Sequence, residues 1–133
     1  MQETIISDSS CIILLDKINE LELLHKLFGI IIITPEVHSE FGKDLPDWFE
    51  LRSPSDKEYQ SKIETNLGKG EASSIALAVE LKNCLLIVDD LKARKFAEKL
   101  NIKFNFFKFI YNLYNRKQFL ISLKFVKLIR FVY

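Results

Sequence analysis

The sequence predicts an α/β fold in which a mostly parallel sheet is covered by helices on both faces. Short apolar runs at 5–6, 30–33 and 84–88 are each followed by a helical pattern, and this alternation is typical of parallel sheets. Right-handed crossovers then place helices on both faces. The chain has 133 residues, of which 48% are hydrophobic and 28% charged, which suits one folded core and excludes intrinsic disorder. We therefore expect a single domain over residues 1–133.

The first elements follow from helix caps and helical spacing. The apolar pair at 5–6 predicts a short strand. Ser9 or Ser10 is expected to cap the next helix, because a hydroxyl oxygen can accept a bond from a free amide of the first turn. Apolar residues at helical spacing predict helical structure over 11–28, interrupted near Asn19 to give two short helices.

Glycine and proline mark the boundaries of the next elements. Gly29 is expected to end the second helix, and the β-branched run at 30–33 predicts a buried strand. A proline in the first turn favours a helix over 35–41, which is followed by a loop over 42–47. Residues 48–51 are expected to form a short edge strand.

The second half of the chain repeats the alternation of strands and helices. Polar residues over 56–66 predict a solvated helix. Gly68 and Gly70 are expected to separate it from a helix over 71–82, which is small and apolar on one face, as in helices that pack on a sheet. The remaining expected elements are a strand over 84–88, a helix over 91–100, a strand over 102–104, and helices over 107–117 and 120–132.

Charge is distributed unevenly, although the formal net charge is only +1. Residues 1–90 contain 17 acids and 8 bases, a net charge of −9, whereas residues 91–133 contain 11 bases and one acid, a net charge of +10. This asymmetry favours a polyanionic partner. In the alternative interpretation the two blocks interleave in the fold and neutralise each other.

The cysteines and the hydropathy pattern predict a cytoplasmic protein. Cys11 and Cys84 both lie in apolar runs, which indicates buried thiols rather than a disulfide framework. The chain opens with no secretory signal pattern, and no apolar run reaches the 18 or so residues of a membrane span.

Acidic residues follow the predicted strands at the edge where open parallel sheets bind ligands. Asp8 follows the first strand, and Asp89 and Asp90 follow the strand at 84–88. Glu40 and Glu71 lie on flanking helices. Clustered carboxylates favour Mg²⁺ or Mn²⁺ over zinc, and such a site can activate water for phosphodiester cleavage. Alternatively, these are ordinary acids at strand ends and helix starts.

Other catalytic patterns are absent from the sequence. The glycines around Lys69 lack the spacing of a phosphate-binding loop, and no serine lies in a nucleophile elbow. His25 and His38 are isolated from other ligand residues, so we expect them to be surface or half-buried residues. A phosphoacceptor receiver-like domain would need a strand-end aspartate acceptor and a lysine on a later strand, and no convincing set is found.

Four segments follow one another in the order and spacing of the PIN-domain family, namely SDSSCIILLDKINELELLHKLFG, IIITPEVHSEFGKDLPDW, KGEASSIALAVEL and LLIVDDLKARKFAEKLNIK. Over residues 4–103 the chain resembles this family, and is most similar to its VapC-like toxins of type II toxin–antitoxin systems. The resemblance implies an α/β/α nuclease fold and Mg²⁺- or Mn²⁺-dependent cleavage of RNA. It also implies a small cognate antitoxin and frequent dimerisation.

The resemblance implies a site made of four acids. The family's acids correspond to Asp8 in ISDSS, Glu40 in VHSEF, Glu71 in KGEASSIALA and Asp89 in LIVDD. These four are the expected catalytic residues, and Asp8, Glu71 and Asp89 are also expected to bind the metal. Asp90, the neighbour of Asp89, is a further candidate ligand.

The basic residues beyond these acids are candidates for holding RNA. The candidates are Lys92, Arg94, Lys95, Lys99 and Lys103, and the first three are the expected nucleic-acid-binding residues. The resemblance ends after residue 103, and 104–133 form a divergent tail rich in basic and aromatic residues. The alternative function is therefore a catalytically impaired PIN-fold module that binds nucleic acid or a protein partner. A weaker alternative is a tail that docks on a membrane surface.

Overall fold

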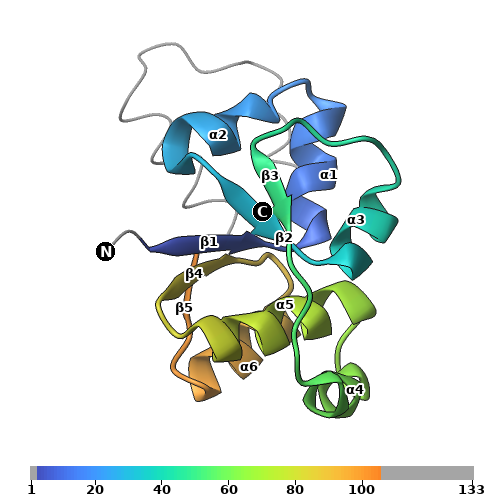
Figure 1. Ribbon diagram of the computed structural model, residues 1–133, viewed down its shortest axis with the longest axis vertical. Coiled ribbons are helices and arrows are strands. Elements are labelled where there is room, and N and C mark those ends of the chain that lie inside the picture. The colour runs from blue at the N-terminus through green and yellow to red at the C-terminus, as the bar shows by residue number, and fades with distance from the viewer. Residues whose placement is uncertain (1–2, 106–133) are drawn as a thin grey trace.

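A computed structural model describes residues 3–105 and shows a five-stranded, all-parallel sheet in the order β3-β2-β1-β4-β5 (Figure 1). The predicted helices over 107–117 and 120–132 lie outside the described residues. The elements are β1 (Thr4–Ser7), α1 (Ser9–Lys17), α2 (Glu22–Phe28), β2 (Ile31–Ile33), α3 (Pro35–Phe41), β3 (Phe49–Leu51), α4 (Lys57–Glu64), α5 (Lys69–Leu81), β4 (Cys84–Ile87), α6 (Leu91–Lys99) and β5 (Lys103–Asn105).

Helices cover both faces of the sheet, which confirms the predicted α/β fold. Figure 1 shows α1, α2 and α3 on one face and α4, α5 and α6 on the other. Successive strand residues point to opposite faces. Accordingly, Ile31 and Ile33 pack with α1–α3, in what we call the α1–α3 core, whereas Ile32 packs with α5 and α6, in the α5–α6 core. Burial on both faces explains why the strands are almost continuously apolar.

The central strand β1 marks the point where the strand order reverses. Ile6 of β1 is in register with Ile32 of β2 on one side and with Leu86 of β4 on the other. Crossovers from these strands leave toward opposite faces, so a crevice forms beyond their carboxyl ends. The residues that directly follow β1 and β4 therefore lie at the edge of the sheet where a ligand site is expected.

The predicted helix boundaries are mostly confirmed, but the first cap is different. The interruption near Asn19 is present, and this residue has a φ of 59°. Gly29 ends α2 with a φ of 77°. The prediction that Ser9 or Ser10 caps α1 is wrong, because the helix begins at Ser9 and the carboxylate of Asp8 accepts from the Cys11 amide instead.

Gly70 lies inside α5, whereas the sequence predicted a break there. The helix begins at Lys69, two residues earlier than expected, and Gly68 is its N-cap. A Cβ atom placed on Gly70 would lie 1.9 Å from the Glu40 Oε1 atom, so a side chain at this position would displace the Glu40 carboxylate. Gly70 thus leaves room for that carboxylate in its observed position and does not act as a helix breaker.

The polar helix α4 is not fully solvated, in contrast to the prediction. Asp56 caps it by accepting from the Tyr59 amide at 3.0 Å, and Gln60 and Ile63 are buried. The loop before α4 is held by Glu80 of α5, whose Oε1 atom accepts from the Ser55 amide at 2.6 Å. One face of α4 therefore packs on α5, although half of its eight residues are charged.

The two cysteines are buried and free, as predicted. Cys11 lies in the α1–α3 core and Cys84 in the α5–α6 core, on opposite faces of the sheet. Burial raises the pKa of both thiols. Within residues 3–105, no helix has the length and apolar character needed to cross a membrane.

Candidate functional site

The carboxylate of Asp8 lies at the carboxyl ends of the two central strands. The Asp8 amide donates to the carbonyl of Ile87 at 3.0 Å, which extends the pairing of β1 and β4 by one residue. The Asp89 amide in turn donates to the Asp8 Oδ2 atom at 3.3 Å. The two strand-end aspartates are therefore directly linked, as the positions of their strands predict. Asp8 is only 1% exposed, whereas Asp89 is half-buried.

Burial makes Asp8 a weak acid in the absence of a cation. The pKa of its carboxyl is raised from 3.8 to about 7, mainly because burial disfavours the charged form. The backbone amides of Cys11 and Asp89 lower the pKa, and the charges of Glu71 and Asp89 raise it further. The Cys11 amide is 3.3 Å from the Asp8 Oδ1 atom. A cation at this position would offset the cost of ionising Asp8 among other carboxylates.

Glu71 enters the site from the first turn of α5. Its half-buried carboxylate lies against Gly68, because a Cβ atom placed on that N-cap residue would be 2.5 Å from the Glu71 Oε2 atom. A carboxylate in the first turn is stabilised by the helix dipole. This position also places Glu71 close enough to Asp8 to raise the pKa of that aspartate. Asp8, Glu71 and Asp89 thus form one electrostatically coupled group.

Glu40 of α3 lies beside the first turns of two other helices, α1 and α5. Its Oε1 atom accepts from the Ser9 hydroxyl at 2.9 Å, which ties α3 to the start of α1. The same oxygen lies in the space that Gly70 of α5 leaves open. Glu40 therefore lies beside the first turn of α5, which also carries Glu71. Unlike Asp8, Glu40 is exposed and its carboxylate can meet solvent.

A buried hydroxyl network fixes α3 against α5 beneath these acids. The Thr34 and Ser73 hydroxyl oxygens are 2.6 Å apart, and Thr34 Oγ1 also accepts from the Val37 amide to cap α3. Ser73 and Ser74 both donate to the Gly70 carbonyl, at 2.9 and 2.8 Å. Both serines are small buried residues of α5, and Thr34 is a supporting residue that the sequence analysis missed.

Asp90 and the first basic residues of α6 follow the acidic group. Asp90 is exposed, and its Oδ2 atom accepts from the Ala93 amide at 3.0 Å, so that it caps α6. Lys92 and Lys95 are exposed on α6, whereas Arg94 is half-buried. The assignment of Asp90 to the metal and of these bases to RNA stays a prediction.

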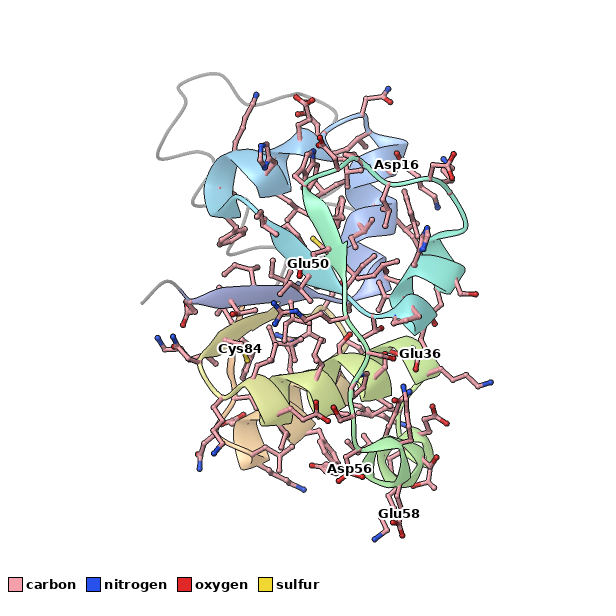
Figure 2. The ribbon with its side chains drawn as sticks, viewed as in Figure 1. Asp16, Glu36, Glu50, Asp56, Glu58 and Cys84 are labelled. Carbon is pink, nitrogen blue, oxygen red and sulfur yellow. The ribbon has the colours of Figure 1, made fainter. Side chains whose placement is uncertain are left out.

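Glu36 is a further acid near this edge that sequence analysis missed. It lies in the first turn of α3, and the Gln60 amide of α4 donates to its carboxylate. Figure 2 shows Glu36 where α3 begins, while Asp16 lies at the far end of α1 from Asp8. The rule that selected Asp8, an acid just beyond a strand, could have found Glu36 after β2. Because Glu36 is held by Gln60, it links α3 to α4.

The donor set suits a hard divalent cation. Asp8, Glu40, Glu71 and Asp89 offer only carboxylate oxygens, the ligands that Mg²⁺ and Mn²⁺ prefer. In the part of the chain that the structure describes, no three acidic, histidine or cysteine side chains are gathered tightly enough to hold a metal as they stand.

The chain matches a known protein family. The family model DUF3368, described as a PIN domain, matches residues 4–123. The match continues beyond residue 103, where the motifs quoted above end. PIN domains are in general nucleases that use divalent metal ions. No curated protein matches the chain.

Proposed function

Because the chain belongs to the PIN-domain family, we propose that it is an Mg²⁺- or Mn²⁺-dependent endoribonuclease whose ions are held by Asp8, Glu71 and Asp89. One observation carries this proposal. Asp8 is buried, and its pKa is raised to about 7 by burial and by the charges of Glu71 and Asp89. A carboxylate that is costly to ionise alone becomes a good ligand when a cation neutralises the group.

Other residues of the site would carry out the remaining steps of hydrolysis. Asp8, Glu71 and Asp89 would hold a divalent ion, which would polarise the phosphate and lower the pKa of a bound water. Glu40 accepts the proton from the attacking water as a general base, and the Ser9 hydroxyl orients its carboxylate. Its exposure leaves it open to solvent and substrate. Asp90 keeps the start of α6 in place by capping it, and is a candidate additional ligand beside Asp89.

Basic residues on α6 would hold the RNA backbone against this acidic group. The cluster alone repels RNA, since every phosphate carries a negative charge. Lys92, Arg94 and Lys95 lie on the helix that directly follows Asp90, so their positive charges stay near the scissile phosphate. Electrostatic contacts of this kind position the substrate and carry no sequence information by themselves.

We further propose that the protein is the toxin of a toxin–antitoxin pair. This role rests on the resemblance to VapC-like proteins, which implies a small cognate antitoxin and a homodimer. The two free, buried cysteines fit a reducing cytoplasm. Co-expression with the neighbouring small gene product should suppress growth arrest, and light scattering should report the mass of a dimer. Growth that is unaffected by expression of the chain alone would count against the toxin role.

The nuclease proposal is tested by RNA cleavage in the presence of Mg²⁺ or Mn²⁺. Asp8→Asn and Asp89→Asn should each lower the cleavage rate by about 100-fold or more, because each removes an anionic ligand. Asp44→Asn is a matched control, since Asp44 is an exposed aspartate in the loop after α3. Cleavage that continues undiminished in both site variants would refute the proposed site.

Calorimetry separates the enzyme from the alternative function. Wild type should bind Mn²⁺, and Asp8→Asn should bind it at least tenfold more weakly. Salt-sensitive RNA binding without any Mn²⁺ binding would instead support a catalytically impaired module.

A further inference from the structure

A basic groove runs along α6. Figure 1 shows α6 on the face of the sheet that α5 also covers. It has a volume of about 210 Å³. Its walls come from α6 and from the turn between α4 and α5, and no carboxylate lines it. We call it the α6 groove, and its lining residues are Asn66, Leu67, Lys92, Lys95, Phe96 and Lys99.

Helical spacing explains why three lysines share this groove. Lys92, Lys95 and Lys99 are three and four residues apart, so they lie on one face of α6. Ala93 and Ala97 are buried and form the face that packs on the α5–α6 core. All three lysines are exposed, and none makes a hydrogen bond or ion pair with the other residues of the described range 3–105. Their charges are therefore available to a ligand.

Arg94 does not share this position, although the sequence analysis grouped it with Lys92 and Lys95. It is half-buried and does not line the groove. Helical geometry puts it roughly 160° around the axis from Lys92 by the shorter way, at about 100° per residue. Lys99, and not Arg94, is therefore the third basic residue that lines the groove with Lys92 and Lys95.

The groove begins at the proposed catalytic edge. Lys92 lies two residues after Asp90, the cap of α6, while Leu67 directly precedes Gly68, the cap of α5. The first turn of α5 carries Glu71, so both walls of the groove start beside the acidic group. A chain that enters the acidic group can continue along the lysines without crossing the sheet.

The dimensions and chemistry favour single-stranded RNA as the occupant. Lys92 and Lys99 are about 10 Å apart along the helix axis, roughly three nucleotides of a stacked strand. Half-buried Phe96 offers an aromatic surface, and Asn66 offers an amide that can bond to a base edge. Unpaired bases can reach such groups, whereas those of a duplex are stacked on each other.

We infer that the α6 groove binds a single-stranded segment of the RNA substrate next to the cleaved phosphate, with Lys92, Lys95 and Lys99 on the backbone and Phe96 against a base. This inference rests on the proposed nuclease function and specifies the form of its substrate. It also replaces Arg94 with Lys99 in the set of backbone contacts.

The test measures binding of a fluorescein-labelled oligouridylate of about 12 nucleotides by fluorescence anisotropy over a range of NaCl concentrations. All variants carry Asp8→Asn so that the RNA stays intact. Replacing Lys92, Lys95 and Lys99 by glutamine should reduce the slope of log K against log salt by about 2, at about 0.7 for each phosphate contact. Affinity at 0.1 M salt should fall about 100-fold. A matched triple variant replaces three exposed lysines outside the groove, Lys17, Lys26 and Lys62.

Each outcome decides the inference. A lower slope in the groove variant with an unchanged slope in the matched variant supports it, and equal slopes in both variants overturn it. Duplex RNA that binds as tightly as oligouridylate overturns the single-strand assignment. Phe96→Leu keeps apolar packing and should weaken binding about tenfold with an unchanged salt slope. Absence of cleavage by the wild-type chain would refute the nuclease proposal alone, because binding is measured separately.

Discussion

Replacing Asp8 by asparagine should change how the stability of the metal-free protein depends on pH. The carboxyl of Asp8 has a pKa raised from 3.8 to about 7, so the folded state binds its proton more tightly than the unfolded state. The free energy of unfolding therefore falls as the pH rises from about 4 to about 7. The free-energy cost of ionising Asp8 in the folded state is fully present above about pH 7 and absent below about pH 4.

The magnitude follows from the two pKa values. A rise from 3.8 to about 7 corresponds to about 4 kcal/mol, at ~1.4 kcal/mol for each pH unit. Asparagine keeps one oxygen for the Cys11 amide but cannot accept a second bond from the Asp89 amide, which costs about 1 kcal/mol. Asp8→Asn should therefore be close to wild type at pH 4.5 and more stable by about 3 kcal/mol at pH 8.

Urea unfolding in EDTA at several pH values measures this difference. The sequence has one tryptophan, Trp48, which stacks on Phe49 at 4.2 Å and packs against the α1–α3 core, so its fluorescence reports on folding. Asp44→Asn, in an exposed loop, should follow the wild-type curve. Parallel curves for wild type and Asp8→Asn between pH 5 and 8 would refute the argument that Asp8 is ionised at a cost. Saturating Mn²⁺ should stabilise wild type more than Asp8→Asn at pH 8.

Three further changes test the surroundings of Asp8. Gly70→Ala places a methyl group 1.9 Å from the Glu40 Oε1 atom, so RNA cleavage should fall about 100-fold, while circular dichroism should show a folded protein. Full RNA cleavage by Gly70→Ala would show that Glu40 does not need the space beside Gly70 for its role. Thr34→Val removes a buried cap and the bond to Ser73, and should lower the free energy of unfolding in urea by about 1–3 kcal/mol. Glu71→Gln should weaken Mn²⁺ binding about tenfold in calorimetry, and unchanged affinity would exclude it as a ligand.

The strands and the strand-end aspartates could be predicted because both follow from local rules. An apolar run bounded by glycine or proline is short enough to be a strand, and its next acidic residue then lies at the ligand-binding edge. The exact start of β2 could not be predicted. Ile30 has the same side chain as Ile31 but is 60% exposed, because pairing with β3 begins where the Ile31 amide donates to the Trp48 carbonyl. The residue at which a strand begins depends on its pairing with the neighbouring strand, and the composition of the strand alone does not determine that pairing.

The support of the site depends on contacts between residues that are distant in sequence. Gly70 reads as a helix breaker in its own segment, yet it permits the approach of Glu40, thirty residues earlier. Likewise, Glu36 is fixed by Gln60 on another helix. Helix propensity describes the effect of a glycine in an isolated helix. At Gly70, the contact with Glu40 from another helix explains why a glycine lies inside α5. A candidate site can thus be found from sequence while the residues that position it stay hidden.

The described structure bears on part of the uneven charge, because residues 3–105 include five of the eleven bases of residues 91–133. If the basic block only neutralised the acidic block, its lysines would pair with acids across the fold. Lys103 does so, since its Nζ atom lies 3.2 Å from a Glu3 carboxylate oxygen. The α6 groove lysines, Lys92, Lys95 and Lys99, do not pair within the described residues, and they lie on the helix that Asp90 caps. An exposed pair such as that of Lys103 contributes little to stability, whereas unpaired lysines keep their full charge for a polyanion. Neutralisation therefore applies to Lys103 of β5, whereas Lys92, Lys95 and Lys99 of α6 fit the proposed binding of an RNA backbone.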